Sequence, residues 1–379
     1  MNRNCKIKDD QTILLGKHLA CDGEANWDRE TKTGQSYLAI SHIHNDHFKE
    51  SKVNNSMSFN NGEITPIMSE GTRQLLSEGS KLNVRHALHK VIKFNDPTSL
   101  PVKNGEEIVV TLKDSKHILG SSQIQVEEQN GQSYGYSGDF GEGITDFIDV
   151  DTLVLDSTNG TRENLVNWTT EDALKELSER VAEATSKHRK VGIVASPGLL
   201  QSTISHFEEI FNDVDFGTYE YSDRCDKSLV KAYSNVYSDN GYSQPKVRSQ
   251  IEAEKKGDFE TQDMFRFSQK PLIILGHNYS QFPHPLPDEP DKFQGIIFNI
   301  KNFCRDNEKP IIQGSEAENV FHVSLTSHAL GETILDYVSN VNPKYVITDS
   351  SRNQDCSKSL AEKIKAKLNI DAIPSSAIQ

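Results

Sequence analysis

One short segment of the sequence, residues 41–47, concentrates side chains that bind metals. It reads SHIHNDH, so His42, His44 and His47 lie beside Asp46 at the end of the strand-like run SYLAIS. In extended backbone residues 42 and 44 share a side, and the following turn can bring Asp46 and His47 around to a second point. Imidazole together with carboxylate is a ligand set that suits Zn²⁺. The segment therefore predicts a metal site rather than a polar loop that happens to be rich in histidine.

Completing such a site needs ligands from elsewhere in the chain, and two segments offer them. Residues 113–122 read KDSKHILGSS and place His117 before a turn of small residues. Residues 136–140 read YSGDF and place Asp139 at the end of a short strand. Each is weak evidence alone, because a lone histidine is usually structural and SGD is a common turn. Their order after the first cluster makes them the leading candidates.

The elements that must position these residues change in character along the chain. Up to about residue 155, short apolar runs between polar turns are typical of strands, with one short helix at 71–79. From residue 170 onward strand-like and helical runs alternate, which indicates a parallel α/β layer; helices are expected at 170–186, 197–211 and 331–338. Residues 213–270 are polar and show no clear pattern. Strands are expected at 12–16, 36–41, 64–68, 107–112, 124–127, 152–155, 190–195, 271–275, 295–298, 310–312, 320–325 and 345–348.

Composition excludes several classes of protein. The 379 residues hold 41 basic against 55 acidic side chains, a net charge of −14, so the chain has no general attraction to phosphate backbones. Five cysteines, at 5, 21, 225, 304 and 356, never form CxxC, which argues against a disulfide scaffold or a cysteine zinc finger. Neither a secretory signal nor a membrane-spanning run is apparent. We therefore expect reduced thiols, a cytoplasmic location and no membrane partner.

The order of the motifs resembles the metallo-β-lactamase superfamily, in which HxHxDH is followed by a histidine and then an aspartate. HILGSSQI, YSGDF and LVLDST resemble, more specifically, the β-CASP nucleases. That family includes ribonuclease J, the pre-mRNA 3′-end cleavage factor, Artemis, the crosslink-repair nucleases and ligase-associated exonucleases. Asp156 in LVLDSTNG matches the acidic motif A, His328 in TSHALGE the motif B histidine, and Asp22 in ACDG the structural aspartate.

The resemblance implies both a fold and a set of ligands. The fold is an α/β metallo-β-lactamase sandwich with αββα layers, formed by residues 1–156 and 321–379. An α/β β-CASP domain at 157–320 interrupts it, with the active site between the two domains. The residues implied as zinc ligands are His42, His44 and His117 for one ion, and Asp46 and His47 for a second, with Asp139 bridging.

The resemblance also implies catalytic roles. A metal-bound hydroxide would attack the phosphorus of nucleic acid. His328 would contact that phosphate or protonate the leaving oxygen, and Asp156 would orient a ligand histidine. Together with Asp46 and Asp139, these are the expected catalytic residues.

Three departures from the family pattern weaken part of this assignment. Many members carry a histidine that ligates the second metal where this chain has Ser350, so the second zinc should be weaker or absent. The neighbouring Asp349 would point the other way along a strand. Asn159 replaces a usual aromatic residue, and ASPGLLQS matches the inserted domain only loosely.

The leading prediction is a zinc-dependent phosphodiesterase, a DNA exonuclease, with a ribonuclease J-like RNA nuclease as the close alternative. A catalytically degenerate β-CASP partner subunit is a third reading, which the intact HIHNDH opposes. A small-molecule hydrolase of the lactamase or glyoxalase type has little need of an inserted domain. For its nucleic acid substrate, an acidic chain needs either a local groove or a basic protein partner.

Weaker signals point to nucleic acid without deciding the matter. The basic stripe NVRHALHKVIK could line a groove, although a solvated helix face explains it equally well. His277 follows a strand and could approach substrate, although an ordinary turn histidine is the commoner case. The residues of the stripe are Arg85, His86, His89, Lys90 and Lys93.

Overall fold

The structure is a computed structural model of residues 1–379. It describes residues 5–28, 33–48, 53, 64–79, 89–102, 105–160, 168–187, 190–208, 210–211, 213–220, 227–267, 270–277, 295–301, 309–315, 319–351 and 354–378. The chain divides into two compact units, each with its own internal contacts. The first unit is Met1–Ser77, Lys81–Asn164 and Ser327–Gln379, and the second is Glu78–Ser80 and Leu165–Thr326.

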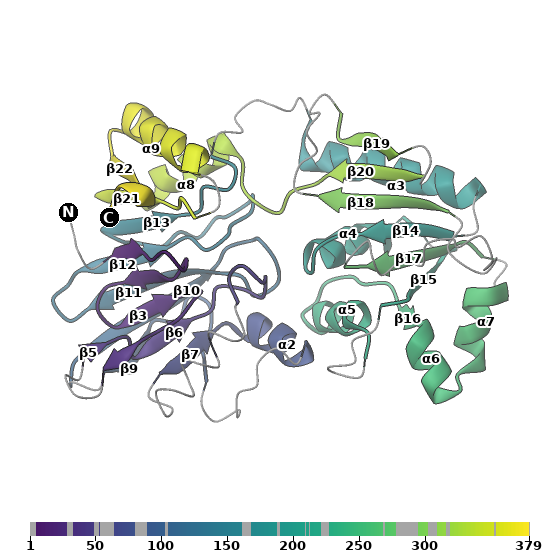
Figure 1. The fold of residues 1–379 in the computed structure, drawn as a ribbon, viewed down its shortest axis with the longest axis horizontal. Coiled ribbons are helices and arrows are strands. Elements are labelled where there is room, and N and C mark those ends of the chain that lie inside the picture. The colour runs from purple at the N-terminus through teal and green to yellow at the C-terminus, as the bar shows by residue number, and fades with distance from the viewer. Residues whose placement is uncertain are drawn as a thin grey trace. The chain divides into compact units, whose positions relative to one another are not determined.

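Two β-sheets form the first unit (Figure 1). The six-stranded sheet has the order β1-β2-β3-β6-β7-β8, with β1 Cys5–Ile7, β2 Ile13–Leu15, β3 Leu19–Cys21, β6 Tyr37–Ala39, β7 Thr65–Met68 and β8 Lys90–Val91. The seven-stranded sheet has the order β22-β21-β13-β12-β11-β10-β9, with β9 Thr98–Pro101, β10 Glu107–Asp114, β11 Ser122–Glu128, β12 Ser133–Tyr136, β13 Thr152–Leu155, β21 Tyr345–Thr348 and β22 Asp371–Pro374. A separate ribbon pairs β4 Trp27–Asp28 with β5 Thr33–Gly34.

The two sheets of the first unit pack their apolar faces together. On β10 the alternate residues Ile108, Val110 and Leu112 are buried, and they share one core with Ile13 and Leu15 of the other sheet. This alternation with period two is what a strand with one core-facing side requires. Each such side chain stabilises the fold by about 1.5–3 kcal/mol. The core therefore explains why the two sheets form a sandwich.

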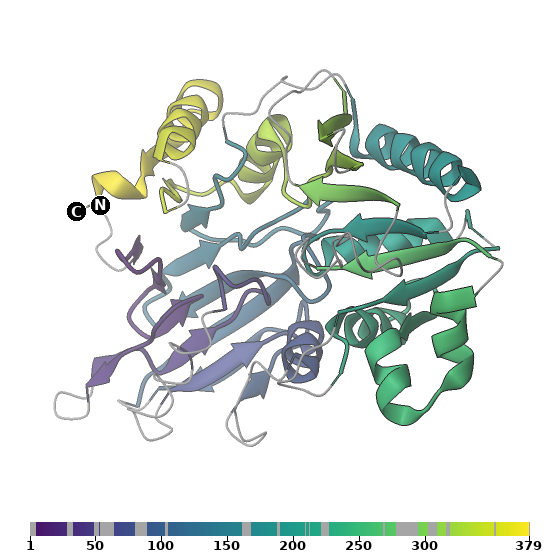
Figure 2. The ribbon, with the colours of Figure 1, turned by 45° about the vertical axis from the view of Figure 1, so that its right-hand side comes forward.

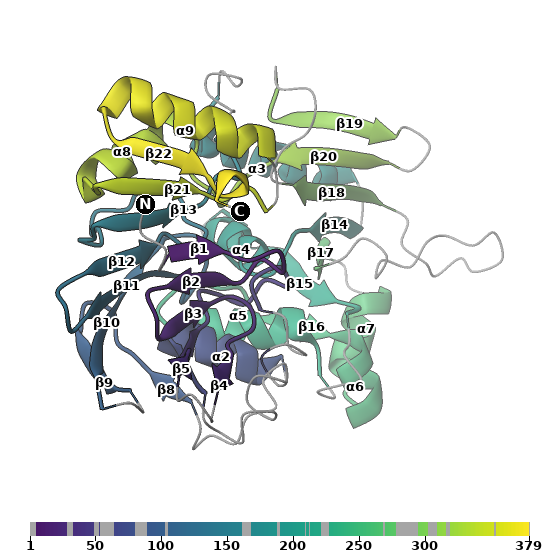
Figure 3. The same cartoon turned by 60° about the vertical axis from the view of Figure 1, so that its left-hand side comes forward.

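Helices cover the seven-stranded sheet on its other face. α8 Gly331–Val341 and α9 Gln354–Leu368 bury Leu335 and Leu360 against Leu153 of β13. Figure 3 shows α8 and α9 beside β21 and β22. α2 Glu70–Glu78 follows β7, and a 3₁₀ turn, Ser375–Ala377, ends the described chain. The predicted α/β sandwich is confirmed.

The second unit is an α/β layer built on a seven-stranded sheet. Its order is β16-β15-β17-β14-β18-β20-β19, and every described pair is parallel except β19 with β20. The strands are β14 Lys190–Val194, β15 Asp215–Thr218, β16 Val247–Ser249, β17 Leu272–Gly276, β18 Ile296–Lys301, β19 Ile311–Ser315 and β20 Val320–Ser324. The helices are α3 Thr170–Lys187, α4 Leu199–Glu208, α5 Leu229–Asp239, α6 Gln250–Lys256 and α7 Phe259–Phe267. The parallel layer expected from the alternating pattern is confirmed.

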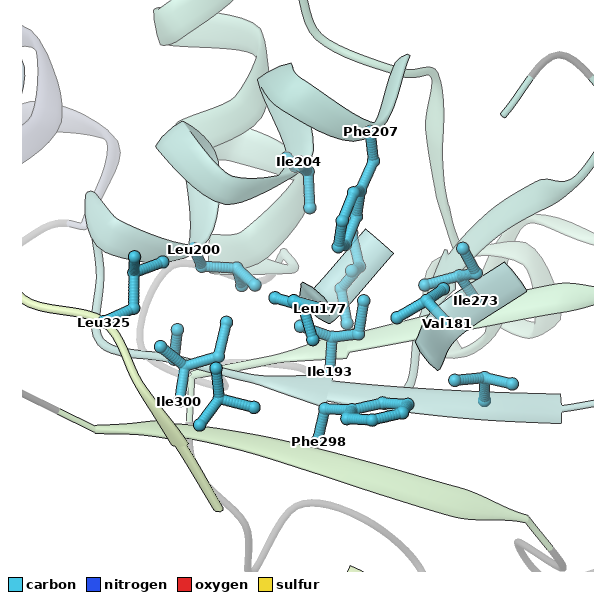
Figure 4. Packing of buried hydrophobic residues seen from close by; sticks show 14 of the residues in the cluster. Leu177, Val181, Ile193, Leu200, Ile204, Phe207, Ile273, Phe298, Ile300 and Leu325 are labelled. Carbon is cyan, nitrogen blue, oxygen red and sulfur yellow. The ribbon is translucent and has the colours of Figure 1, made fainter. Parts of the chain in front are cut away.

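Both faces of this sheet are buried. One face packs against α3 and α4 through residues such as Leu177, Ile193 and Phe207 (Figure 4). The other face packs Ile274 and Phe265 together, the latter from α7, which lies beside α6 (Figure 2). Strands buried on both faces read as continuous apolar runs, which is why KVGIVA and PLIIL were recognisable.

The segment 213–270 is where prediction from sequence fell short. Its described residues form two strands and three helices, none longer than 11 residues, too short for periodicity to stand out. The usable sequence signals for these helices were their N-terminal capping residues. Ser228 accepts the N–H of Lys231 at the start of α5, and Ser249 accepts that of Glu252 at the start of α6. Among the described residues, no helix combines the length and apolar character needed to cross a bilayer.

Candidate metal centre

The loop after β6 holds the first histidines in place by anchoring them on both sides. Ile43 and Phe48 are buried, while the N–H groups of His47 and Phe48 both donate to the carbonyl of His44, at 3.0 and 2.7 Å. This short turn draws His47 back toward the strand end. His42 is fully buried and His44 partly buried.

His117 lies in the tight connection between β10 and β11. The hydroxyl of Ser121 accepts the N–H groups of His117 and Ile118 at 3.2 and 3.1 Å, which folds the connection onto itself. Gly120 has φ +80°, and a Cβ there would overlap the backbone nitrogen of Thr72 at the start of α2. On the other side of the ring, Nδ1 of His117 lies 3.0 Å from the carbonyl of Ser327.

Asp139 follows β12, the strand next to β13. Gly138 has φ +59°, and a side chain there would overlap the carbonyl of Ser122. Ser115 donates its hydroxyl to the backbone carbonyl of Asp139 at 2.8 Å, which ties the β10–β11 connection to this strand end. The Asp139 carboxylate is 2% exposed. His117 and Asp139 therefore reach one point because their strands are neighbours in the sheet order.

Four of the predicted ligands converge on one position. Nδ1 of His44 lies 3.1 Å from Nε2 of His42 and 3.2 Å from Nε2 of His117. Oδ2 of Asp139 lies 3.7 and 3.8 Å from the same two Nε2 atoms. If Nδ1 of His44 carried a proton, it could form a hydrogen bond to only one of its two histidine neighbours. A cation at this point could instead be bound by all four ligand atoms. Four ligands around tetrahedral zinc stand about 3.3–3.4 Å apart, so the set fits such an ion.

The His47 ring packs against that of His42, with ring centroids 4.1 Å apart, and both of its nitrogens have a carboxylate partner. Its Nε2 is 3.1 Å from Oδ2 of Asp139, and its Nδ1 is 2.8 Å from Oδ2 of Asp22. The aspartate that family resemblance marked as structural thus orients a predicted ligand. Asp22 adopts φ +53°, which an aspartate tolerates better than most residues.

A second donor group shares Asp139 with the first. It consists of Asp139, Asp156 and His328, all buried, with one donor atom from each lying within 4.8 Å of the others. Nδ1 of His328 is 3.1 Å from Oδ2 of Asp156, and its Nε2 is 3.7 Å from Oδ2 of Asp139. Asp156 does orient a histidine, but this is His328 rather than one of the predicted zinc ligands. Asp156 directly follows β13, and His328 lies close to this strand end just after the chain has re-entered the first unit at Ser327.

Two positions tied to the expected second metal are not among the converging donors of the described residues. Asp46 is exposed, and neither donor group among the described residues includes it. Ser350 is 8% exposed; its hydroxyl lies 2.8 Å from that of Ser357 and accepts the N–H of Ser376 at 3.3 Å. Asp349 accepts the hydroxyl of Ser157 through its backbone carbonyl.

The histidines of the site fall into two groups by the direction in which their pKa is shifted. Burial lowers the pKa of His42 well below its usual value, and the neighbouring His47 and His44 lower it further. Burial and the nearby His328 do the same to the pKa of His117. Both rings are therefore neutral, the form that ligates metals. For His47, burial alone would lower the pKa, but the carboxylates of Asp139 and Asp22 raise it to about 10.

Neither metal-binding group found among the described residues includes a residue of the weaker sequence signals. His277 belongs to the second unit, where its Nδ1 is 3.2 Å from Oε1 of Glu220 in a partly buried pair. Lys90 belongs to strand β8, not to a helix, with His89 just before it and the exposed Lys93 just after. Arg85 and His86, like Cys225 and Cys304, lie outside the described residues. The remaining cysteines, Cys5, Cys21 and Cys356, are buried.

Sequence reasoning missed two groups that hold ligands. The Ser41 hydroxyl lies 3.0 Å from Nδ1 of His42, and the Ser327 carbonyl receives His117. A serine immediately before a ligand histidine was a usable signal. The backbone carbonyl of Ser327 was not, since any residue supplies one.

No protein-family model matches the chain. Among curated proteins, it is 38% identical over 58 residues to "Uncharacterized protein in lig 3′region" of Acidianus ambivalens, which covers 14% of this chain and 41% of that protein. The chain thus spans about two fifths of the curated relative that it matches.

Three solved structures with low overall similarity are proteins of metallo-β-lactamase type. Zn²⁺-bound PqqB from Methylobacterium extorquens is 12% identical with a TM-score of 0.26, over 36% of this chain and 52% of that one. The metallo-β-lactamase fold protein YhfI from Bacillus subtilis is 13% identical with a TM-score of 0.28, over 41% and 65%. Metallo-β-lactamase IND-7 is 17% identical with a TM-score of 0.22, over 36% and 62%. The evidence for function in this chain is its two groups of histidine and aspartate residues, which are able to bind a metal ion.

Proposed function

We propose that this protein is a zinc-dependent phosphodiesterase of the β-CASP nuclease family that degrades nucleic acid, with DNA ends as its leading substrate. The observation that carries the proposal is the meeting of two donor groups at Asp139: His42, His44 and His117 on one side, and His328 with Asp156 on the other. On this proposal residues 157–320 form the inserted β-CASP domain. The motif resemblance at HILGSSQI, YSGDF and LVLDST supports the same reading.

The first donor group is the place for the metal. His42 and His117 are neutral and offer Nε2, His44 offers Nδ1, and Asp139 adds one negative charge. When bound there, a zinc ion supplies Lewis acidity toward a phosphoryl oxygen and makes a coordinated water acidic enough to attack at neutral pH. Burial of His42, His117 and Asp139 keeps bulk water from competing for these donors.

His328 is the chain's own candidate for proton transfer. Its Nδ1–H donates to Asp156, which fixes the ring and leaves Nε2 facing the carboxylate of Asp139. From that position His328 would contact a substrate phosphate or protonate the leaving oxygen. Asp156 would stabilise the protonated ring, as an orienting carboxylate does for a catalytic histidine.

Binding of a nucleic acid substrate must depend on local features of the surface. With a net charge of −14 the chain has no overall attraction to nucleic acid. We infer that a local basic surface, to which Lys90 and Lys93 belong, or a basic protein partner supplies the attraction.

The test is cleavage of four end-labelled substrates of one sequence: single- and double-stranded DNA and RNA. Wild type is compared with Asp139→Asn, which removes the shared charge, and with Asp149→Asn, a matched change of an exposed carboxylate in the same unit. Laddering from a DNA end, lost in Asp139→Asn and kept in Asp149→Asn, supports the proposal. Cleavage of RNA alone favours the ribonuclease alternative at the same residues. Zinc bound without cleavage of any substrate, even with cell extract added, favours the non-catalytic partner subunit.

A further inference from the structure

Ser41 lies between a carboxylate and a predicted metal ligand, and its hydroxyl contacts both. The side chain is fully buried, with Oγ 2.5 Å from Oδ2 of Asp22 and 3.0 Å from Nδ1 of His42. Its backbone N–H donates to Oδ1 of the same Asp22 carboxylate at 2.8 Å. An ionised carboxylate only accepts hydrogen bonds, so the hydroxyl proton points toward Asp22. The hydroxyl oxygen then accepts the Nδ1–H of His42.

This arrangement determines which nitrogen of His42 carries the proton. With the proton on Nδ1, the lone pair is on Nε2, the atom that lies 3.1 Å from Nδ1 of His44 and faces Asp139. We propose that Ser41 is a positioning residue that links Asp22 to His42 by hydrogen bonds. It fixes the orientation of the His42 ring and the Nδ1–H tautomer, which leaves Nε2 able to bind the metal. The inference rests on the metal site of the proposed function.

Through Ser41, one buried carboxylate contacts two histidines, whose Nε2 atoms both lie near Oδ2 of Asp139. Asp22 receives Nδ1 of His47 directly at 2.8 Å and reaches His42 through the Ser41 hydroxyl. Asp22 is 3% exposed, so water does not replace either contact. Outer partners of this kind typically change metal affinity by about 10–100-fold when removed.

The sheet, rather than a flexible loop, sets the spacing of this pair. Asp22 directly follows β3 and Ser41 closely follows β6, and these strands are parallel neighbours with Cys21 opposite Ala39. The Asp22 N–H donates to the Ala39 carbonyl at 3.0 Å, continuing the ladder past the strand end. The left-handed conformation of Asp22 then turns its carboxylate toward Ser41.

The decisive comparison is between Ser41→Thr and Ser41→Val, which have the same shape and differ only in the hydroxyl. Zinc dissociation constants are measured by competition with a chromophoric chelator. The valine variant should bind about 10–100-fold more weakly than the threonine variant. Thr203→Val is the control, because it removes a buried hydroxyl of the second unit that donates to the Leu199 carbonyl. Equal zinc affinity in the two Ser41 variants, or an equal loss in Thr203→Val, would overturn the inference.

A second measurement needs no variant. Long-range ¹⁵N–¹H spectra of metal-free wild type report the tautomer of His42, and Ser41 requires the Nδ1–H form. The Nε2–H form would overturn the inference even where the valine variant does not fold. Wild type that binds no zinc would instead overturn the proposed function, whereas wild type that binds zinc with an affinity unchanged in Ser41→Val would overturn the role of Ser41 alone.

Discussion

Nε2 of His328 lies 3.7 Å from Oδ2 of Asp139, and the two residues come from the two sequence segments that flank the second unit. Asp139 precedes the main segment of that unit, Leu165–Thr326, and His328 is the second residue after that segment. The preceding residue, Ser327, also receives Nδ1 of His117 through its carbonyl. The donor cluster is therefore complete only when the chain has returned from the second unit.

Replacing His328 should separate chemistry from metal binding. For His328→Ala we expect kcat to fall by about 10²–10⁴-fold, the usual contribution of a general acid, with zinc content unchanged. Single-turnover cleavage and metal analysis on the same sample check both quantities. Loss of zinc from this variant would show that His328 is a ligand instead.

Removing the metal should destabilise the fold by mass action. A ligand present at 100 times its dissociation constant stabilises the native state by about 2.7 kcal/mol. We expect chelator-treated wild type to melt at a lower temperature, recovered on adding Zn²⁺. Asp139→Asn should show a much smaller recovery. An identical recovery in wild type and Asp139→Asn would place the bound zinc elsewhere.

A histidine at position 350 should not restore a second metal. The Ser350 hydroxyl is buried among Ser357 and Ser376, so a larger ring would overpack this cluster, at a cost of about 1–3 kcal/mol. Ser350→His should therefore be less stable in urea and bind no more zinc than wild type. A full additional equivalent of zinc would contradict this account.

Gly120 should prove necessary for the placement of His117. Gly120→Ala adds left-handed strain of about 1–2 kcal/mol and an overlap with the Thr72 backbone. Gly105→Ala is the matched control, since Gly105 also has positive φ, +89°, but nothing lies within 4 Å of an added Cβ. We expect weakened zinc binding only in Gly120→Ala, measured by chelator competition. Equal zinc affinities would mean that the α2 contact does not position the ligand.

The pair of buried Glu220 and partly buried His277 should make the stability of the second unit sensitive to acid. Burial alone would raise the pKa of Glu220, but the charge of His277 and hydrogen bonds from its side chain and backbone N–H lower it. A lowered folded pKa means that the stabilisation is present above the unfolded value of about 4.3 and is lost as pH falls through the folded pKa. Glu220→Gln should be less stable than wild type at neutral pH, and the gap should narrow in acid. Urea unfolding at several pH values tests this; a constant gap would contradict it.

The sequence by itself determined the chemistry of the donors and most of the elements that carry them. SHIHNDH was recognisable as three histidines and an aspartate after a strand-like run, and His117 and Asp139 by their order after that cluster. The long alternating and apolar runs of β10, β13, β14 and β17 were equally legible, since their burial imposes a period or a continuous apolar stretch. The elements of 213–270 were not, because its strands have only three or four residues and its helices no more than 11, too few to show a clear period.

Only the tertiary structure decided which donors share a point and what orients them. Asp156 proved to hold His328, Ser41 to link Asp22 with His42, and Asp46 to stay exposed while its neighbour His47 is buried. These relationships depend on which strand ends lie side by side in the two sheets and on where the chain re-enters the first unit. Contacts between residues so far apart in the chain are set by sheet order and packing, which leave no local pattern in the sequence.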